Sequence, residues 1–490
     1  MSRIQSQGFW NTIFSYTGAA IGVVNLIFLY PFYLNTDEIG LIRILTSVSI
    51  LYAQVASFGF NSAILRFFPH YRSRQGAGFP AAVLVLTLAG FLVATFIALL
   101  FRPVVESVYL ESSALFVRYY SWLIPLSLFV MLFSLAESFL RALYKTVASL
   151  FLREVLLRLL TTFGVVAIIA GWFTFEWFMV WYIAIHGIIL IVLLVGLIRE
   201  QAIRFNWVPG FFRYRRIKKV MQYGLVSLFA GATSSFITII DSLMIGAYLT
   251  LDDVGIYSIA FFMGSVIAIP ARGISRIAVP MVAEAWKKNR PDKIAVLYAR
   301  TSLLHFAIGL FILTGILINL QAVFTFLPDA FAAGALVVFW IGTGHLIDIT
   351  GGINGYILIT SRRYHNDLLF NLAFIALSVV TNLLLIPVYG ITGAAMASAL
   401  SYLGINAIRT VYIWRAFSMH PFNRTYLKVA LPLLAAGFTA GWIPLTGIPA
   451  LADILFRSIL FTVLAAGLGY VTGVSRLLQT ALAELKGAEY

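Results

Sequence analysis

Long apolar segments separated by short charged or Gly/Pro-containing breaks restrict this chain to very few folds. A helix that crosses a bilayer needs about 20 apolar residues, and the breaks divide the sequence into about fourteen such spans. Only 11% of its 490 residues are Asp, Glu, Lys or Arg, whereas soluble domains carry about 25%. The sequence therefore predicts an all-α polytopic membrane protein and excludes a soluble enzyme. The predicted spans cover residues 10–34, 41–67, 79–101, 115–140, 149–170, 175–198, 221–249, 254–283, 301–327, 331–360, 366–388, 391–414, 427–446 and 453–474.

The basic residues indicate how the spans are oriented. The chain has 34 Lys+Arg against 19 Asp+Glu, a formal net charge of +15. If the N-terminus is cytoplasmic, most of the basic residues fall in inner connections and many of the acids in outer ones, as the positive-inside rule requires. This distribution predicts cytoplasmic N- and C-termini and an even number of spans, fourteen or twelve. It also accounts for the basic excess without a nucleic-acid partner. The longest inner loop, 199–220, is interpreted as an orientation signal that contacts anionic membrane lipids.

The sequence lacks the residue patterns that are typical of enzymes that use a cofactor or a metal. There is no cysteine, which excludes disulfides, thiol catalysis and Cys-ligated metals. Neither a P-loop nor a zinc-type His/Glu cluster occurs. We therefore expect no catalytic residue, no cofactor and no metal.

An internal repeat divides the chain into two lobes. The segment Asp37-Glu38-Ile39-Gly40-Leu41 resembles Asp252-Asp253-Val254-Gly255-Ile256, and in this register Asn25 lies opposite Asp241. Gly59 followed by Pro69 similarly matches Gly273 followed by Pro280. Both copies begin on the same side, so the repeat is parallel and relates the lobes by an axis along the membrane normal. It predicts lobes at 1–198 and 221–416, the basic loop 199–220 between them, and 417–490 as spans 13–14 with a cytoplasmic tail. Two such lobes would enclose a cleft that opens alternately to each side.

Two stretches carry a family resemblance. One runs over 240–260, and the other, 382–397, holds an Asn-x-x-x-Ile-Pro helix end followed by Tyr389-Gly390. Both resemble polysaccharide (Wzx-type, O-antigen) flippases of the MOP superfamily, which also contains lipid II flippases and MATE exporters. Leu65-Arg66-Phe67-Phe68-Pro69 fits as well.

The resemblance has specific implications for fold and function. It implies a MATE-like two-lobe bundle in the bacterial inner membrane. It implies translocation of an undecaprenyl-pyrophosphate-linked oligosaccharide for cell-surface polysaccharide such as the O-antigen of lipopolysaccharide. Polysaccharide polymerases of the same pathway are the implied protein partners.

Arginines inside the spans are the first candidates for substrate contact, because charges at membrane depth face a bundle interior or a wet cavity. Arg272 and Arg276 are four residues apart and therefore share a helix face. Arginine stays protonated and binds phosphate in a bidentate way, so the pair is a candidate pyrophosphate clamp. Snorkelling or pairing with an acid is the alternative for both. Arg66, at the inner end of span two, is a further candidate for receiving the head group.

Polar groups elsewhere in the spans complete the candidate set. Asn25 and Asn61 are candidates for contact with the substrate, and Asn61 could instead form a helix–helix hydrogen bond. Asp241, and His345 with Asp348 on one face of span ten, are candidates either for coupling to H⁺ or Na⁺ or for a structural ion pair.

Acid–base pairs at i,i+4 spacing are expected to be local. They are Glu137–Arg141, Glu154–Arg158 and Asp453–Arg457.

Two other functions fit a membrane chain of this kind. A cation-coupled MATE-like exporter would share the two lobes, but would more often have twelve spans and acids in its cleft. A membrane polymerase or ligase would usually need a sizeable outer loop with catalytic groups, and the longest outer connection here is short and lacks histidine. Spans 13–14 and the Arg272/Arg276 pair favour the flippase.

Overall fold

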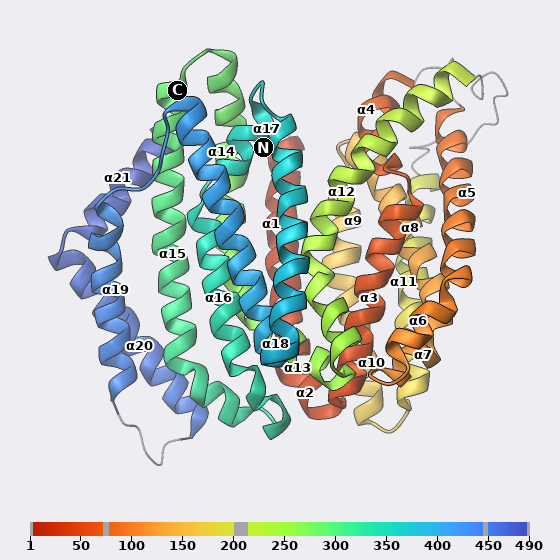
Figure 1. The fold of residues 1–490 in the computed structure, drawn as a ribbon, viewed down its shortest axis with the longest axis horizontal. Coiled ribbons are helices and arrows are strands. Elements are labelled where there is room, and N and C mark those ends of the chain that lie inside the picture. The colour runs from red at the N-terminus through yellow and green to blue at the C-terminus, as the bar shows by residue number, and fades with distance from the viewer. Residues whose placement is uncertain (1–2, 72–77, 200–213, 444–448, 488–490) are drawn as a thin grey trace. The chain divides into compact units, whose positions relative to one another are not determined.

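The computed structural model describes residues 3–71, 78–199, 214–443 and 449–487. Throughout these ranges the secondary structure is helical and contains no strand, as the sequence predicts (Figure 1). The backbone hydrogen bonds of a helix are all internal, so helices can occupy an environment without water. The basic loop predicted at 199–220 lies largely outside the described residues.

The helices form two compact units, residues 1–255 and 256–490. In unit 1 the long helices α3, α8, α11 and α12 pack around one another. The helix expected to open the second lobe, α12, packs against α3 and α4 and therefore belongs to unit 1 by its contacts. The elements of this unit up to the unit boundary are α1 (Arg3–Val23), η1 (Val24–Leu29), α2 (Tyr30–Tyr33), α3 (Thr36–Ala56), α4 (Phe60–Tyr71), α5 (Phe79–Leu100), α6 (Arg102–Tyr109), α7 (Ala114–Tyr119), η3 (Tyr120–Trp122), α8 (Leu123–Ala142), α9 (Val147–Leu150), η4 (Phe151–Leu156), α10 (Leu157–Ile169), α11 (Phe175–Arg199) and α12 (Tyr214–Tyr248).

Span two is a broken helix. Between α3 and α4 the backbone takes left-handed φ angles at Phe58 (48°) and Gly59 (69°). A Cβ added at Gly59 would lie 2.0 Å from the carbonyl oxygen of Gly224 on α12. Only glycine permits both this φ and this close approach of the α12 backbone. The break is therefore held in place by tertiary packing.

The two copies of the repeat motif touch each other. A Cβ on Gly40 would lie 2.0 Å from the carbonyl oxygen of Leu251, and one on Gly255 would lie 2.0 Å from that of Thr36. The two contacts are reciprocal, as expected where related segments meet at a local twofold axis. The Thr36 hydroxyl also donates a hydrogen bond to Asp252. The later part of the repeat does not have the same backbone, because Gly59 breaks span two whereas Gly273 lies inside α14.

Unit 2 is built from longer helices. The range α18 contains two helices that fold back on each other at Gly390, where φ is 58° and ψ −138°. Contacts from Phe374 to Tyr402 and from Thr381 to Ala397 join its two arms. The elements are α13 (Leu251–Ser265), which begins in unit 1, η6 (Val266–Ala268), α14 (Ile269–Lys287), α15 (Pro291–Phe326), η7 (Asp329–Gly334), α16 (Ala335–Thr350), α17 (Asn354–Thr360), α18 (His365–Phe417), α19 (Thr425–Trp442), α20 (Ala450–Val471) and α21 (Val474–Gly487).

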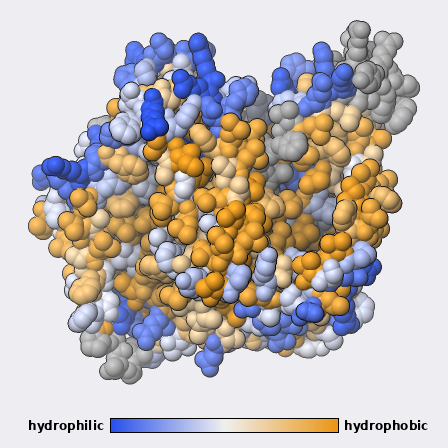
Figure 2. Space-filling model, viewed as in Figure 1, coloured by the Kyte–Doolittle hydropathy of each residue, from blue (hydrophilic) through white to orange (hydrophobic). Residues whose placement is uncertain are grey.

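The surface and the helix lengths agree with a membrane protein. Ten helices in the described part of the chain are long and apolar enough to cross a bilayer, and α18 counts as one of them despite its turn at Gly390. Apolar side chains cover the middle of the helices, and hydrophilic ones gather at their ends (Figure 2). The count of fourteen and the cytoplasmic location of both termini stay predictions.

The C-terminal segment forms a further helix, which the sequence analysis describes only as a tail. Val474, Leu477 and Leu478 of α21 pack against α15 and α19 at Leu303 and Val429. These contacts hold α21 against unit 2.

Candidate functional site

A cavity with mixed polar and apolar walls lies inside unit 1, where α3, α4, α8 and α11 meet. Its volume is about 290 Å³, close to the lower limit of typical ligand sites. Asn61, on the first turn of α4 after the Phe58–Gly59 break, is one of its walls. The lining residues are Thr46, Ile50, Ala53, Gln54, Asn61, Phe129, Val130, Phe133, Ser134, Arg153, Leu157, His186 and Ile189. We call this space the unit 1 cavity.

The one charged group among these lining residues is neutralised by a neighbour. Arg153 forms an ion pair with Glu137, whose side chain is 10% exposed. The i,i+4 spacing predicts that Glu137 pairs with Arg141, and that prediction is wrong. Arg141 donates to Ser138 instead, because Arg153 reaches Glu137 from a neighbouring helix. An arginine already paired in this way is poorly suited to bind an anion.

One hydrogen-bond acceptor at the unit 1 cavity, Asn61 Oδ1, is buried and has no donor in the described part of the chain. His186 is 8% exposed, and its Nδ1 lies 2.8 Å from the carbonyl oxygen of Tyr182. A carbonyl only accepts, so Nδ1 carries a proton. A buried acceptor without a donor costs about 1–3 kcal/mol, which favours a ligand or water beside Asn61.

Asn25 is held inside unit 1 by span five. Its Oδ1 accepts a hydrogen bond from Thr162 at 2.7 Å, and its Nδ2 donates to the carbonyl of Arg158 at 3.3 Å. Glu154 and Arg158 form the predicted i,i+4 ion pair at 3.1 Å. Both segments contain a π-helical turn, at η1 and η4. These contacts assign Asn25 a packing role, and its contact with substrate stays a prediction.

Arg66 lies exposed near the end of α4. Its guanidinium carbon is 4.5 Å from the centroid of the Tyr223 ring and 5.6 Å from that of Phe67. Such cation–π contacts hold the side chain in place and leave its N–H groups available for a phosphate.

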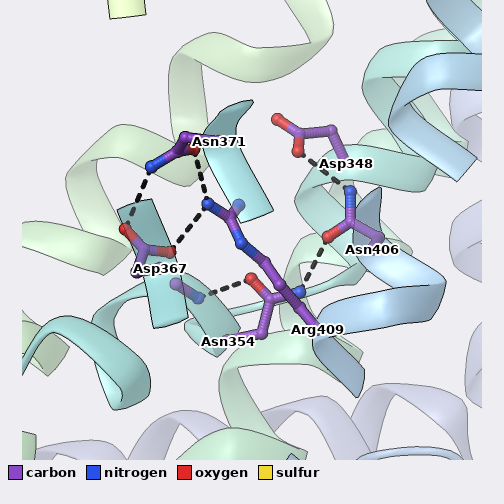
Figure 3. Close-up of polar contacts among 7 residues, drawn as sticks. Asp348, Asn354, Asp367, Asn371, Asn406 and Arg409 are labelled. Carbon is purple, nitrogen blue, oxygen red and sulfur yellow. Dashed lines mark hydrogen bonds and ion pairs between the residues drawn. The ribbon is translucent and has the colours of Figure 1, made fainter. Parts of the chain in front are cut away.

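Unit 2 holds a charged network between the two arms of α18 (Figure 3). Arg409 Nη2 lies 2.8 Å from Asp367 Oδ1 and 2.9 Å from Asn371 Oδ1. Asn371 in turn donates to the other carboxylate oxygen of Asp367 at 3.1 Å. The side chains of Arg409 and Asp367 are 15% and 12% exposed. The charges therefore compensate each other inside the bundle.

A separate chain of amides, beside this network, ends at Asp348. Asn354 donates to Asn406 at 2.8 Å, and Asn406 donates to Asp348 Oδ1 at 3.1 Å (Figure 3). Glycine allows the approach, because a Cβ on Gly351 would lie 2.1 Å from Asn406 Oδ1. The helix break between α16 and α17 falls at this point, in the glycine-rich part of span ten. His345, one turn before Asp348, packs between the rings of Phe261 and Tyr402.

The remaining predicted site residues lie on α12 and α14. Asp241 is 5% exposed, and its neighbour Ser242 accepts a hydrogen bond from Arg43 Nε at 3.2 Å. Arg272 and Arg276 lie on α14, while their side chains fall outside the part of the chain that the structure describes. A Cβ added at Gly273 between them would meet no atom within 4 Å, so this stretch of α14 borders open space.

A larger groove in unit 1 differs in chemistry from the unit 1 cavity. It measures about 800 Å³, and apart from Gln7 and Lys145 its lining residues are apolar or glycine, among them Phe151, Leu193 and Leu197. Such walls offer few partners to a polar head group.

Comparisons with known proteins bear on these observations. Residues 5–286 match the model of the family described as "Polysaccharide biosynthesis protein". The chain belongs to this family. No curated protein matches the sequence.

Solved structures similar to this family member are membrane transporters. The lipid II flippase MurJ in an inward closed conformation matches with a TM-score of 0.73 at 11% identity, over 94% of this chain and 98% of that one. An inward-facing MATE multidrug transporter of the MOP superfamily matches with a TM-score of 0.58 at 13% identity, over 85% and 95%. The MATE multidrug transporter DinF-BH matches with a TM-score of 0.54 at 17% identity, over 84% and 95%. The likeness establishes a fold shared by flippases and MATE transporters, as the sequence resemblance implied.

Several polar groups that the fold brings together are not evident from the sequence. Gln54 and Ser134 line one cavity only when α3 and α8 pack. Asn354 and Asn406 meet across the α16–α17 break. For the second pair the sequence offers one indication, because Asn354 closely follows Gly351-Gly352, where a helix break is expected. No residue near Asn354 in the sequence indicates that Asn406 is its partner.

Proposed function

We propose that the protein is a flippase that moves undecaprenyl-pyrophosphate-linked oligosaccharide units across the bacterial inner membrane by alternating access. The observation that carries this proposal is membership of a polysaccharide biosynthesis family by a multi-pass chain with a flippase-like fold. Cell-surface polysaccharides such as O-antigen would be the product of the pathway, and a polysaccharide polymerase a partner.

The arginines are proposed to hold the pyrophosphate. Arg272 and Arg276 lie one turn apart on α14, next to the open space at Gly273. Ala278, Val282 and Ala285 form the buried stripe of the same helix, and the spacing of Arg272 and Arg276 places them on a different face. Arg66, held by Tyr223, is proposed to contact the head group as it enters. The energy source is proposed to be a coupled H⁺ or Na⁺, with Asp241, Asp348 and His345 as the coupling groups, or the membrane potential, or consumption of the product.

Removal of the clamp tests the proposal. Arg272→Ala and Arg276→Ala should each lower the translocation of lipid-linked oligosaccharide in proteoliposomes about tenfold or more, because a hydrogen bond to a charged group is worth about 1.5–3 kcal/mol. Arg290→Ala is the matched control, since this arginine is exposed beyond the end of α14 and should leave the rate unchanged.

Two results would contradict parts of the proposal. Wild-type rates in both clamp variants would overturn the role of these arginines. Absence of translocation by the wild-type protein, together with export of a small organic cation, would replace the flippase with the MATE-like exporter.

A further inference from the structure

The unit 1 cavity has the chemistry of a site for a small neutral molecule with several hydroxyl groups. Thr46, Gln54, Asn61, Ser134 and His186 place hydroxyl, amide and imidazole groups around it. They include one buried acceptor without a donor in the described part of the chain, Asn61 Oδ1. A hydroxyl donates one hydrogen bond and accepts others, so it suits such a lining.

Charge argues against ionic ligands. No Asp or Glu is among the described lining residues, so a cation would meet no carboxylate at the wall. Arg153 is already paired with Glu137, so an anion would have to compete with a close ion pair. The hydrocarbon tail of a lipid would leave the polar groups unsatisfied, at the desolvation cost stated above.

Aromatic walls distinguish this cavity from a simple water site. Phe129 and Phe133 line it together with the polar groups. The ring of Phe129 is held against α11, because a Cβ at Gly187 would lie 3.3 Å from it. The guanidinium carbon of Arg153 lies 5.4 Å from the centroid of the Phe133 ring. Fixed apolar rings beside hydrogen-bonding groups match a sugar ring, which presents C–H faces and hydroxyl edges.

The size limits the ligand further. A volume of 290 Å³ corresponds to about ten water molecules at liquid density. This is room for a single sugar ring with its hydroxyl groups and too little for a chain of several rings.

We propose that the unit 1 cavity binds one neutral sugar unit of the lipid-linked oligosaccharide and makes the protein selective for that sugar. The inference rests on the proposed flippase function and adds a site to it. Asn61, Gln54 and His186 bind the hydroxyl groups, and Phe129 and Phe133 pack on the ring. The broken helix at Phe58–Gly59 positions Asn61, as discontinuous helices do at transporter binding sites.

The test compares two lipids on the purified full-length protein. The dissociation constant Kd is measured for undecaprenyl-pyrophosphate-linked oligosaccharide and for undecaprenyl pyrophosphate without sugar. The wild-type protein should bind the sugar-bearing lipid more tightly. Asn61→Leu and Gln54→Leu should each weaken binding of that lipid about tenfold, because each leaves ligand hydroxyls without a partner. Both variants should leave the Kd of the sugar-free lipid unchanged.

A matched control separates binding from packing. Asn319 on α15 also has a buried Oδ1 without a partner in the described part of the chain, but it is not among the residues that line the unit 1 cavity. Asn319→Leu should leave the Kd for both lipids unchanged. A loss of affinity for both lipids in Asn61→Leu and Gln54→Leu would indicate a structural effect and overturn the inference.

The remaining outcomes separate the two proposals. Equal Kd values for both lipids in the wild-type protein, or an unchanged preference in both variants, would overturn the sugar site and leave the flippase standing. Failure of the wild-type protein to bind either lipid would overturn the proposed function itself.

Discussion

Arg409 and Asp367 illustrate, at the scale of single residues, how a charge is kept inside an apolar helix bundle. They lie 42 residues apart in sequence and face each other across the hairpin of α18. An ion pair out of water persists because each charge compensates the other and nearby amides fill the remaining hydrogen bonds. Asn371 supplies two such hydrogen bonds here, while Arg409 Nε is buried without a partner in the described part of the chain.

Removing one partner of this pair should destabilise the protein strongly. Asp367→Leu leaves the Arg409 charge buried and uncompensated, and should lower the free energy of unfolding by about 3–5 kcal/mol. The double variant Asp367→Leu with Arg409→Met removes both charges and should be more stable than the single variant. Unfolding in mixed detergent micelles measures both.

An exposed ion pair is the control for this effect. Arg118 and Glu176 are 2.6 Å apart but 68% and 65% exposed. Glu176→Ala should therefore change the free energy of unfolding by less than about 1 kcal/mol. Equal losses in Asp367→Leu and Glu176→Ala would show that burial does not decide the strength of these pairs.

At the scale of helices, glycine decides where two segments come closest. Gly40 and Gly255 allow the two copies of the repeat to meet backbone to backbone. Neither contact can be relieved by a side-chain rotation, because the opposing atom is a carbonyl oxygen of the main chain. Each copy of the repeat therefore carries the glycine that lets the other copy approach.

A single methyl group at this contact should force the segments apart. Gly40→Ala should lower the free energy of unfolding by about 1–3 kcal/mol, the usual cost of overpacking. Gly469→Ala on α20 is the matched control, since a Cβ at this position would meet no atom within 4 Å. It should be neutral or mildly stabilising, because alanine favours helix over glycine by about 1 kcal/mol. A stable Gly40→Ala protein would mean that α3 and the start of α13 separate at little cost.

At the scale of the whole molecule, the predicted orientation can be tested directly. The sequence has no cysteine, so single cysteines can be introduced without removing any. Glu111 and Arg290 are exposed in the structure and are predicted to lie outside and inside, because basic inner connections orient the spans.

A membrane-impermeant maleimide should distinguish the two positions. Glu111→Cys should be labelled in intact cells, and Arg290→Cys only after the membrane is permeabilised. The reverse pattern would place both termini outside and reject the orientation drawn from the charges.

Interactions within one turn of a helix were accessible from the sequence. Glu154–Arg158 and Asp453–Arg457 form as predicted, at 3.1 and 2.5 Å, because helical geometry brings residues i and i+4 close together. The same spacing fails at Glu137, where Arg153 of another segment takes the place of Arg141. The division into apolar helices was also predictable from the sequence, because a backbone in lipid must satisfy its hydrogen bonds within the helix.

The all-helical membrane fold, the repeat and the family resemblance could therefore be predicted from the order of the residues alone. Three features could not: Glu137 pairs with Arg153 and not with Arg141, Arg409 meets Asp367, and the Phe58–Gly59 break rests on Gly224. Each of these depends on which helices are neighbours, and the helical period carries no information on that. The unit 1 cavity exists for the same reason, because its walls come from segments that meet only when the helices pack.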